Sequence, residues 1–177
     1  MVHVLPGIPP RQLTSMRHAR GVSDDSIIDH RRLAVTLFNQ TWELMAKEDR
    51  SAADDDRMLH MAHASRHHWG EVGTAANLAR GEWQCSRVYA VLQRPEPCLH
   101  HARRVLALCA ENGLVDWDLA FGHEALARGL ALTGDVDAAR TEIERALAVP
   151  IADDEDRSHL LTDLATVPGI APFWSAG

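Results

Sequence analysis

The stretch His123–Pro150, HEALARGLALTGDVDAARTEIERALAVP, decides the fold class of this chain. Its apolar residues recur with helical spacing on both sides of Gly134, as they do in amphipathic helices. Gly134 is typical of a helix end, and Asp135 can cap the helix that follows it. Pro150 then ends this second helix. The stretch therefore predicts two antiparallel helices joined by a short turn.

The same signals continue in both directions along the chain, and no segment shows the sustained alternation of a strand. Caps and helix breakers predict seven helices, over residues 25–47, 53–69, 74–92, 97–111, 116–133, 135–148 and 153–167. We expect three regions, namely an extended or disordered N-terminal arm at 1–22, a helical domain at 23–168 and a C-terminal tail at 169–177. The predicted fold is one all-α domain of stacked antiparallel hairpins.

The chain also aligns with itself after a shift of about 41 residues. The shift superposes Tyr89 on Leu130 and Cys98 on Ala139, and the turn near Ala52 falls on the same period. Three hairpins of similar length followed by a capping helix predict a helical solenoid. In such a fold each hairpin buries its apolar surface against its neighbours.

The stretch quoted above resembles the tetratricopeptide repeat family. The family's small or apolar positions correspond, to within one residue, to Leu126, Ala127, Gly134, Ala139, Ala146 and Pro150. The hairpin before it matches more loosely, with Tyr89 at the aromatic position and Gln93-Arg94 in place of the Gly-Asp turn. The first hairpin matches only in length, and the period exceeds the roughly 34 residues of the family.

This resemblance covers roughly a third of the chain well and implies a right-handed superhelix with a concave groove for a ligand or peptide. It implies no chemistry. The segments HASRHHW, residues 63–69, and RGEWQCSRVY, residues 80–89, also resemble segments of a bacterial protein family, to which we attach no activity.

The net charge and the cysteines limit the kinds of partner and the cellular location that we expect. The chain has 18 Lys and Arg against 25 Asp and Glu, a formal charge of -7, which disfavours nucleic acid and membrane surfaces. We expect a peptide or protein partner, or a small ligand. The three cysteines lie in apolar helical patterns, so we predict a reducing, cytoplasmic location. Cys98 and Cys109 share an apolar surface with Val105, which predicts core positions.

A polar stripe marks the helix at 74–92. Asn77, Arg80, Gln84 and Arg87 fall within about 80° of one another, beside Trp83. The first helix of each hairpin lines the concave surface of a helical-repeat protein, where Arg can bind carboxylates or phosphates and Trp offers a flat apolar contact. The predicted ligand-binding residues are Asn77, Arg80, Trp83, Gln84, Arg87 and Glu124.

Two interpretations of this stripe stay open. The arginines can bind a small anionic ligand or an acidic peptide in the groove. Alternatively, Arg80 and Arg87 form salt bridges with Asp118, Glu124 or Glu43 of neighbouring hairpins and only rigidify the stack.

Eleven histidines form the second unusual feature. His60, His63 and His67 lie within about 60° of one another on one helix, with His68 close by. Imidazoles at this spacing can share a zinc, copper, iron or nickel ion, and Glu43 from the preceding helix could complete the site. The alternatives are a stripe of solvent-facing histidines without a ligand, or histidines that line the groove and contact its ligand.

We therefore expect a non-enzymatic binding module whose groove uses Arg80, Trp83 and Arg87, together with Glu43, His60 and His63. The alternative function is a metal-binding protein or a metal-dependent enzyme that uses His60, His63, His67 and Glu43. A third reading is a structural or oligomerising module, including a homodimer. The residues leave open whether the chain is an enzyme.

Overall fold

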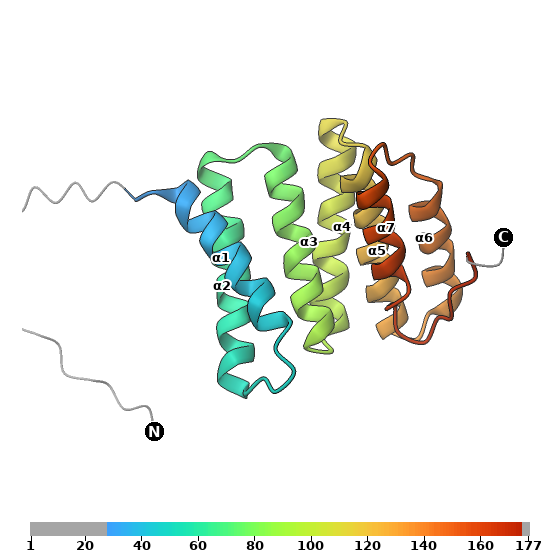
Figure 1. Cartoon of the computed structure of the whole chain (residues 1–177), viewed down its shortest axis with the longest axis horizontal. Coiled ribbons are helices and arrows are strands. Elements are labelled where there is room, and N and C mark those ends of the chain that lie inside the picture. The colour runs from blue at the N-terminus through green and yellow to red at the C-terminus, as the bar shows by residue number, and fades with distance from the viewer. Residues whose placement is uncertain (1–27, 175–177) are drawn as a thin grey trace, which may run out of the picture.

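A computed structural model describes residues 28–174, and within this range every regular element is an α-helix (Figure 1). The helices are α1 His30–Met45, α2 Ala52–Val72, α3 Ala75–Val91, α4 Pro95–Asn112, α5 Asp116–Leu132, α6 Val136–Ala148 and α7 Asp154–Leu164. The prediction of an all-α protein with seven helices is thus confirmed for the described residues.

Local hydrogen bonds explain where most helices begin. Asp135 accepts the backbone N–H of Ala138 at the start of α6, as the sequence predicts. Thr74 and Asn77 form a reciprocal capping box at the start of α3. Gly113 ends α4 with a φ of 63°, a left-handed conformation that costs glycine little. These short-range signals require no tertiary contact, which is why the sequence reveals them.

The first helix differs from its prediction. We expected it to begin near residue 25, but residues 28 and 29 are not helical and α1 begins at His30. Asp29 caps it by accepting the backbone N–H of Arg32 at 2.9 Å. The expected arm at residues 1–22 lies outside the described residues, as does the last part of the tail, residues 175–177.

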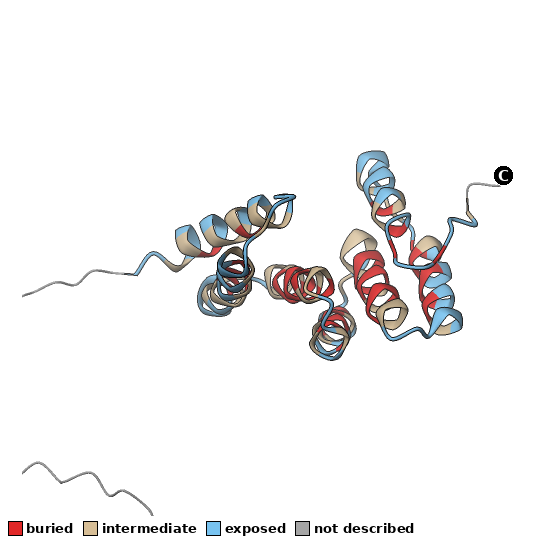
Figure 2. Ribbon diagram, turned by 90° about the horizontal axis from the view of Figure 1, so that it is seen from below, coloured by how far each residue is buried: buried red, intermediate tan, exposed pale blue. Residues whose placement is uncertain are grey.

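The helices pack mostly against their neighbours in sequence, as the hairpins α1/α2, α3/α4 and α5/α6. A second set of contacts joins α1 to α3, α3 to α5 and α5 to α7. Figure 2 shows the result, with α1 and α7 lying on the same side of α3 and α5. The odd-numbered helices therefore share one side of the molecule.

Two apolar clusters hold the helices together. The larger one spans α3 to α7 and continues into the segment after α7, where Val167 and Ile170 are buried. Cys98 and Cys109 are buried as predicted, with at most 2% exposure. The smaller cluster joins α2 to α3 around Met58 and Cys85. Buried residues accordingly follow the middle of the molecule in Figure 2.

The tail packs on the body, because Trp174 contacts the larger cluster. Phe173 lies beside it, with the guanidinium of Arg140 5.4 Å from its ring. No helix within residues 28–174 has the length and apolar character needed to cross a membrane.

Candidate functional site

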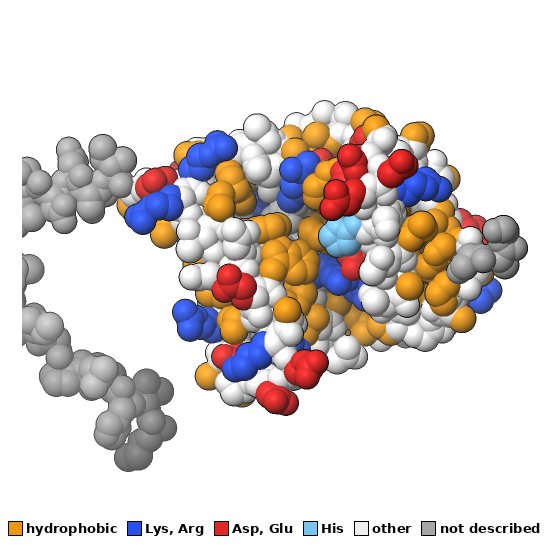
Figure 3. Space-filling model, viewed as in Figure 1, with side chains coloured by type: hydrophobic (Ala, Val, Ile, Leu, Met, Phe, Trp, Pro, Cys, Tyr) orange, Lys and Arg blue, Asp and Glu red, His pale blue; other side chains and the backbone are white. Residues whose placement is uncertain are grey.

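The odd-numbered helices enclose a pocket of about 500 Å³. Its lining residues are Phe38, Trp42, Arg80, Trp83, Arg87, Trp117, Phe121, Asp156, His159 and Asp163. They come from α1, α3, α5 and α7, so each odd-numbered helix contributes. Figure 3 shows this side of the molecule, with hydrophobic side chains gathered across its middle and charged side chains beside them. We call this cavity the aromatic pocket.

Trp83 forms the centre of the aromatic pocket. Its ring centroid lies 5.1 Å from that of Trp42 on α1 and 5.1 Å from that of Phe121 on α5. Trp117 is 6.1 Å away in an edge-to-face arrangement. Such offset and edge contacts are favourable for aromatic rings. The rings therefore make a rigid apolar surface that spans three helices.

Arg80 is tied to α5. Its Nε and Nη2 atoms donate to the two carboxylate oxygens of Asp118 at 2.8 and 3.0 Å, and its guanidinium lies 4.4 Å from the ring centroid of Trp117. The Arg80 side chain nevertheless stays 38% exposed. Its other guanidinium N–H groups make no hydrogen bond with the described residues. Arg80 thus retains donors that a ligand could use.

Arg87 belongs to a buried charge network. The carboxylate of Glu124, which is fully buried, accepts from Arg87 Nη1 at 3.1 Å and from Arg128 Nη2 at 2.6 Å. Trp83 Nε1 donates to the same carboxylate at 3.4 Å. Burial alone would raise the pKa of Glu124, but the two guanidinium groups outweigh it and hold this pKa below its usual value. Glu124 is therefore ionised beneath the pocket.

The α7 wall adds a second carboxylate. Asp163 lies 3.5 Å from Arg87 Nη2, and burial raises the pKa of Asp163 above its ordinary value. The Nε atom of Arg87 is buried and has no acceptor among the described residues. Arg87 is more deeply buried than Arg80, and its unbonded Nε–H is enclosed by the protein.

The predicted ligand-binding residues occupy different depths. Arg80, Trp83 and Arg87 line the aromatic pocket, while Glu124 lies behind it. Asn77 caps α3 and lines a smaller neighbouring cavity. Gln84 is fully buried and donates to the carbonyl oxygen of Phe38.

The salt-bridge interpretation also describes part of what the structure shows, since Arg80 pairs with Asp118 and Arg87 with Glu124. Glu43 is exposed. Sequence reasoning did not anticipate that Phe38 and Trp42 would enter the pocket, although their four-residue spacing places both on one side of α1.

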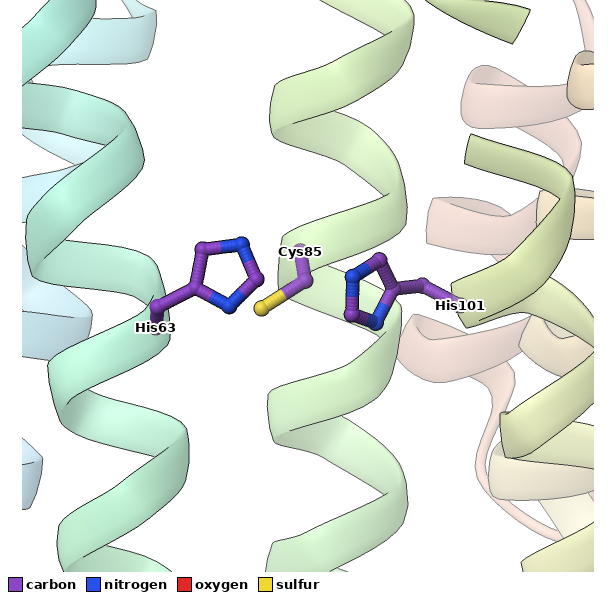
Figure 4. A group of neighbouring side chains, drawn as sticks. All are labelled: His63, Cys85 and His101. Carbon is purple, nitrogen blue, oxygen red and sulfur yellow. The ribbon is translucent and has the colours of Figure 1, made fainter. Parts of the chain in front are cut away.

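A second group of side chains with metal-binding atoms lies on the other side of α3. His63 from α2, Cys85 from α3 and His101 from α4 bring one ligand atom each within 4.8 Å of one another. Figure 4 shows the two imidazole rings on either side of the Cys85 sulfur. Cys85 is fully buried, and both histidines are partly buried. This group, which we call the His–Cys group, could hold a metal ion.

Hydrogen bonds fix both imidazoles. His101 Nδ1 donates to Glu82 at 2.6 Å, and Glu82 also accepts from Arg66 Nε at 2.9 Å. Burial opposes the charge of Glu82, but His101 and Arg66 hold the pKa of this carboxyl below its usual value. His63 Nε2 shares a hydrogen bond of 2.9 Å with the hydroxyl of Tyr89.

The Cys85 thiol is not a reactive nucleophile in this setting. Burial, and secondarily the charge of Glu82, raise its pKa to about 12. Burial and the nearby His101 lower the pKa of His63, so this imidazole is neutral near pH 7. A neutral imidazole retains a lone pair, which is the form that binds a metal.

Only one of the predicted metal ligands enters the His–Cys group. His63 points into it, whereas His60 and His67 are exposed on α2 and Glu43 is exposed on α1. His101 and Cys85 come from α4 and α3, and the sequence pattern had not marked either residue as a metal ligand. One sequence signal could have identified these two ligands. The successive helices α2, α3 and α4 each carry a metal-binding residue on a side that faces a neighbouring helix of the three.

Over residues 28–174 the fold is thus all-α, with seven helices packed mostly as sequential neighbours. No known protein family, curated protein or solved structure matches the chain.

Proposed function

We propose that the chain is a non-enzymatic, tetratricopeptide-like binding module whose aromatic pocket takes a peptide segment or a small anionic ligand. The observation that carries the proposal is the aromatic pocket itself, where five aromatic side chains from three helices surround a cavity of about 500 Å³. A cavity of this size, lined by apolar rings and a few polar groups, is typical of ligand sites.

The arrangement of the helices supports the tetratricopeptide-like part of this proposal. Each hairpin packs on the next, and the first helices of successive hairpins also contact one another. In solenoids of helical hairpins, such first helices line a concave binding surface. The aromatic pocket is lined by α1, α3, α5 and α7, the helices that this architecture would place there.

The charges around the pocket limit the ligand. Glu124 and Asp163 already compensate Arg87, and Asp118 compensates one edge of Arg80. We therefore propose a ligand that places an apolar or aromatic group against Trp83 and a single anionic group near the remaining donors of Arg80. A polyphosphate would require more free cationic groups than these.

The test uses anilinonaphthalene sulfonate, a fluorescent probe with an aromatic body and one anionic group. We expect about one equivalent to bind the wild-type chain and to be displaced by short peptides that contain aromatic and acidic residues. Trp117→Ala and Phe38→Ala each remove an aromatic wall of the pocket and should weaken probe binding at least about tenfold, the effect of losing one good aromatic contact.

The matched control is Phe173→Ala, which removes an exposed aromatic ring outside the pocket. It should bind the probe as the wild type does. Circular dichroism establishes that each variant keeps its helices. Unchanged probe affinity in folded Trp117→Ala and Phe38→Ala would sink the proposal.

A further inference from the structure

We propose that His63, Cys85 and His101 bind one transition-metal ion, preferentially zinc, between α2, α3 and α4. The proposal concerns the opposite side of α3 from the aromatic pocket and does not depend on the proposed binding function. It also differs from the histidine stripe expected on α2, because two of its three ligands come from other helices.

The spacing of the donor atoms is close to what zinc requires. With Zn–N bonds of about 2.0–2.1 Å and Zn–S bonds of about 2.3 Å, the ligand atoms of a tetrahedral site lie about 3.3–3.6 Å apart. The three ligand atoms here all lie within 4.8 Å of one another. Rotations of the side chains that bring the atoms about 1 Å closer would complete the site without moving the helices.

The free ring nitrogens point the right way. His101 uses Nδ1 to bond Glu82, and His63 uses Nε2 to bond Tyr89. Each ring therefore keeps one nitrogen for a metal, namely Nε2 of His101 and Nδ1 of His63. In Figure 4 a nitrogen of each ring lies on the side of the Cys85 sulfur.

The surroundings of His101 match those of a metal-binding histidine. Such histidines usually donate their second ring N–H to a carboxylate or carbonyl oxygen, which fixes the tautomer and increases ligand basicity. Glu82 accepts this bond, and Arg66 in turn holds Glu82. The side chain of Glu82 is only 10% exposed, so this orientation is held within the packed interior.

The donor set selects the class of ion. Two imidazoles and one thiolate suit zinc and other late transition metals, whereas magnesium and calcium prefer oxygen ligands. Three protein ligands leave one tetrahedral position for an added ligand, as in zinc sites that are not closed by four side chains. A bound ion would also link α2, α3 and α4 directly, in addition to the hydrogen bonds that Glu82 and Tyr89 of α3 make with them.

The test uses cobalt(II), which reports both coordination number and ligand type by its absorption spectrum. The full-length chain is stripped of metal with a chelator under reducing conditions and titrated with cobalt. We expect one equivalent to bind, with the visible bands of tetrahedral cobalt and a thiolate-to-cobalt charge-transfer band, and zinc to displace it. Cys85→Ser should abolish the charge-transfer band, and His101→Ala should weaken cobalt binding at least about tenfold.

The matched controls are His60→Ala and His67→Ala, which remove exposed histidines from the same helix as His63. Both should keep the wild-type spectrum. The proposal is overturned if the wild-type chain binds no cobalt, or if His67→Ala abolishes binding that Cys85→Ser retains. If Cys85→Ser fails to fold, the wild-type spectrum tests the proposal by itself. Bound cobalt without a thiolate-to-cobalt charge-transfer band would overturn the proposal.

Discussion

The polar groups on the two sides of α3 differ in how their neighbours satisfy them. On the pocket side, Arg80 and Arg87 are paired with carboxylates from α5 and α7, and aromatic rings leave a cavity between them. On the other side, the ligand atoms of His63, Cys85 and His101 approach one another. Because the arginines on the pocket side are already paired with carboxylates, the cavity there suits an apolar group. The nitrogen and sulfur lone pairs of the His–Cys group are close together, and such an arrangement suits a single cation.

Each side also depends on one buried carboxylate. Glu124 on α5 holds two arginines beneath the pocket, and Glu82 on α3 holds Arg66 and His101 beside the His–Cys group. Glu124 is fully buried, while the side chain of Glu82 is 10% exposed. We therefore expect Glu124 to matter mainly for stability and Glu82 mainly for the orientation of His101.

The largest effect should come from Glu124→Gln. The substitution leaves the guanidinium of Arg128 buried without a counter-charge and leaves Arg87 with Asp163 alone. Breaking a buried ion pair in this way typically costs about 3–5 kcal/mol of unfolding free energy. Urea denaturation followed by circular dichroism measures this change. Glu144→Gln, at an exposed position on α6, is the control and should change stability by less than about 0.5 kcal/mol. A loss below about 1 kcal/mol for Glu124→Gln would show that the network is not a structural centre.

Two glycine substitutions should have opposite signs. A Cβ added at Gly81 would lie 2.6 Å from Cδ of Arg66 and 3.4 Å from its Cα, so Gly81→Ala should push α2 from α3 and cost about 1–3 kcal/mol. At Gly70 the nearest atom is Arg66 Nη1 at 3.7 Å. Gly70→Ala should therefore stabilise α2 by about 0.5–1 kcal/mol, since glycine is a poor helix former.

Thermal and urea unfolding of both glycine variants provide the measurement. A destabilised Gly70→Ala variant would contradict the described environment of this position. For Gly81→Ala, we also expect weaker cobalt binding, because the displaced Arg66 also holds Glu82.

Glu82→Gln distinguishes a role of Glu82 in orienting His101 from a role in holding the fold. Glu82→Gln keeps the size of the side chain but weakens the bond to His101 Nδ1, so metal affinity should fall about 10–100-fold. Probe binding in the aromatic pocket should stay at the wild-type level. Cobalt titration and probe titration of the same sample make this comparison. If cobalt affinity and probe affinity fell equally, Glu82 would act by holding α3 in place rather than by orienting His101.

The smallest effect concerns acid stability. Because the pKa of Glu124 is below its ordinary value of 4.5, its contribution is complete above about pH 4.5 and is lost as the pH falls through the folded-state value. Glu82 acts in the same direction. Asp163 acts in the opposite direction, because its raised pKa lets the folded chain bind this proton first and gain stability on acidification.

Asp163→Asn should therefore steepen the acid loss by at most about 1.4 kcal/mol per pH unit, the limit for one proton. Urea midpoints measured between about pH 6 and pH 3.5 test this, with the exposed Asp137→Asn as control. A shallower loss in Asp163→Asn than in the wild type would contradict the assigned direction.

The fold was largely predictable because its signals are local. Asp135, Thr74 and Gly113 set helix ends through hydrogen bonds or backbone angles within a few residues. The start of α1 was not predictable, because several Ser and Asp residues between 23 and 29 qualify as caps and the sequence pattern favours a start near residue 25. Choosing between equivalent caps requires the tertiary context.

The candidate sites were only partly predictable. The pattern on α3 correctly placed Arg80 and Trp83 on one side, and a pocket lies there. The pattern on α2 gave a stripe of histidines but not which edge of it faces α3. His63 lies at that edge, while His60 and His67 do not. Helix rotation, which follows from packing across α2, α3 and α4, decides this.

Arg128 connects the end of the described chain to its centre. Besides Glu124, it binds the carbonyl oxygens of Asp163 and Thr166, at the end of α7. A helix at the end of a stack commonly frays first, because it has a neighbour on one side only. Fraying of α7 would expose the buried ion pair of Arg128 and Glu124 to water. We expect α7 and α5 to exchange their amide hydrogens together, so that this end of the molecule opens cooperatively with its interior.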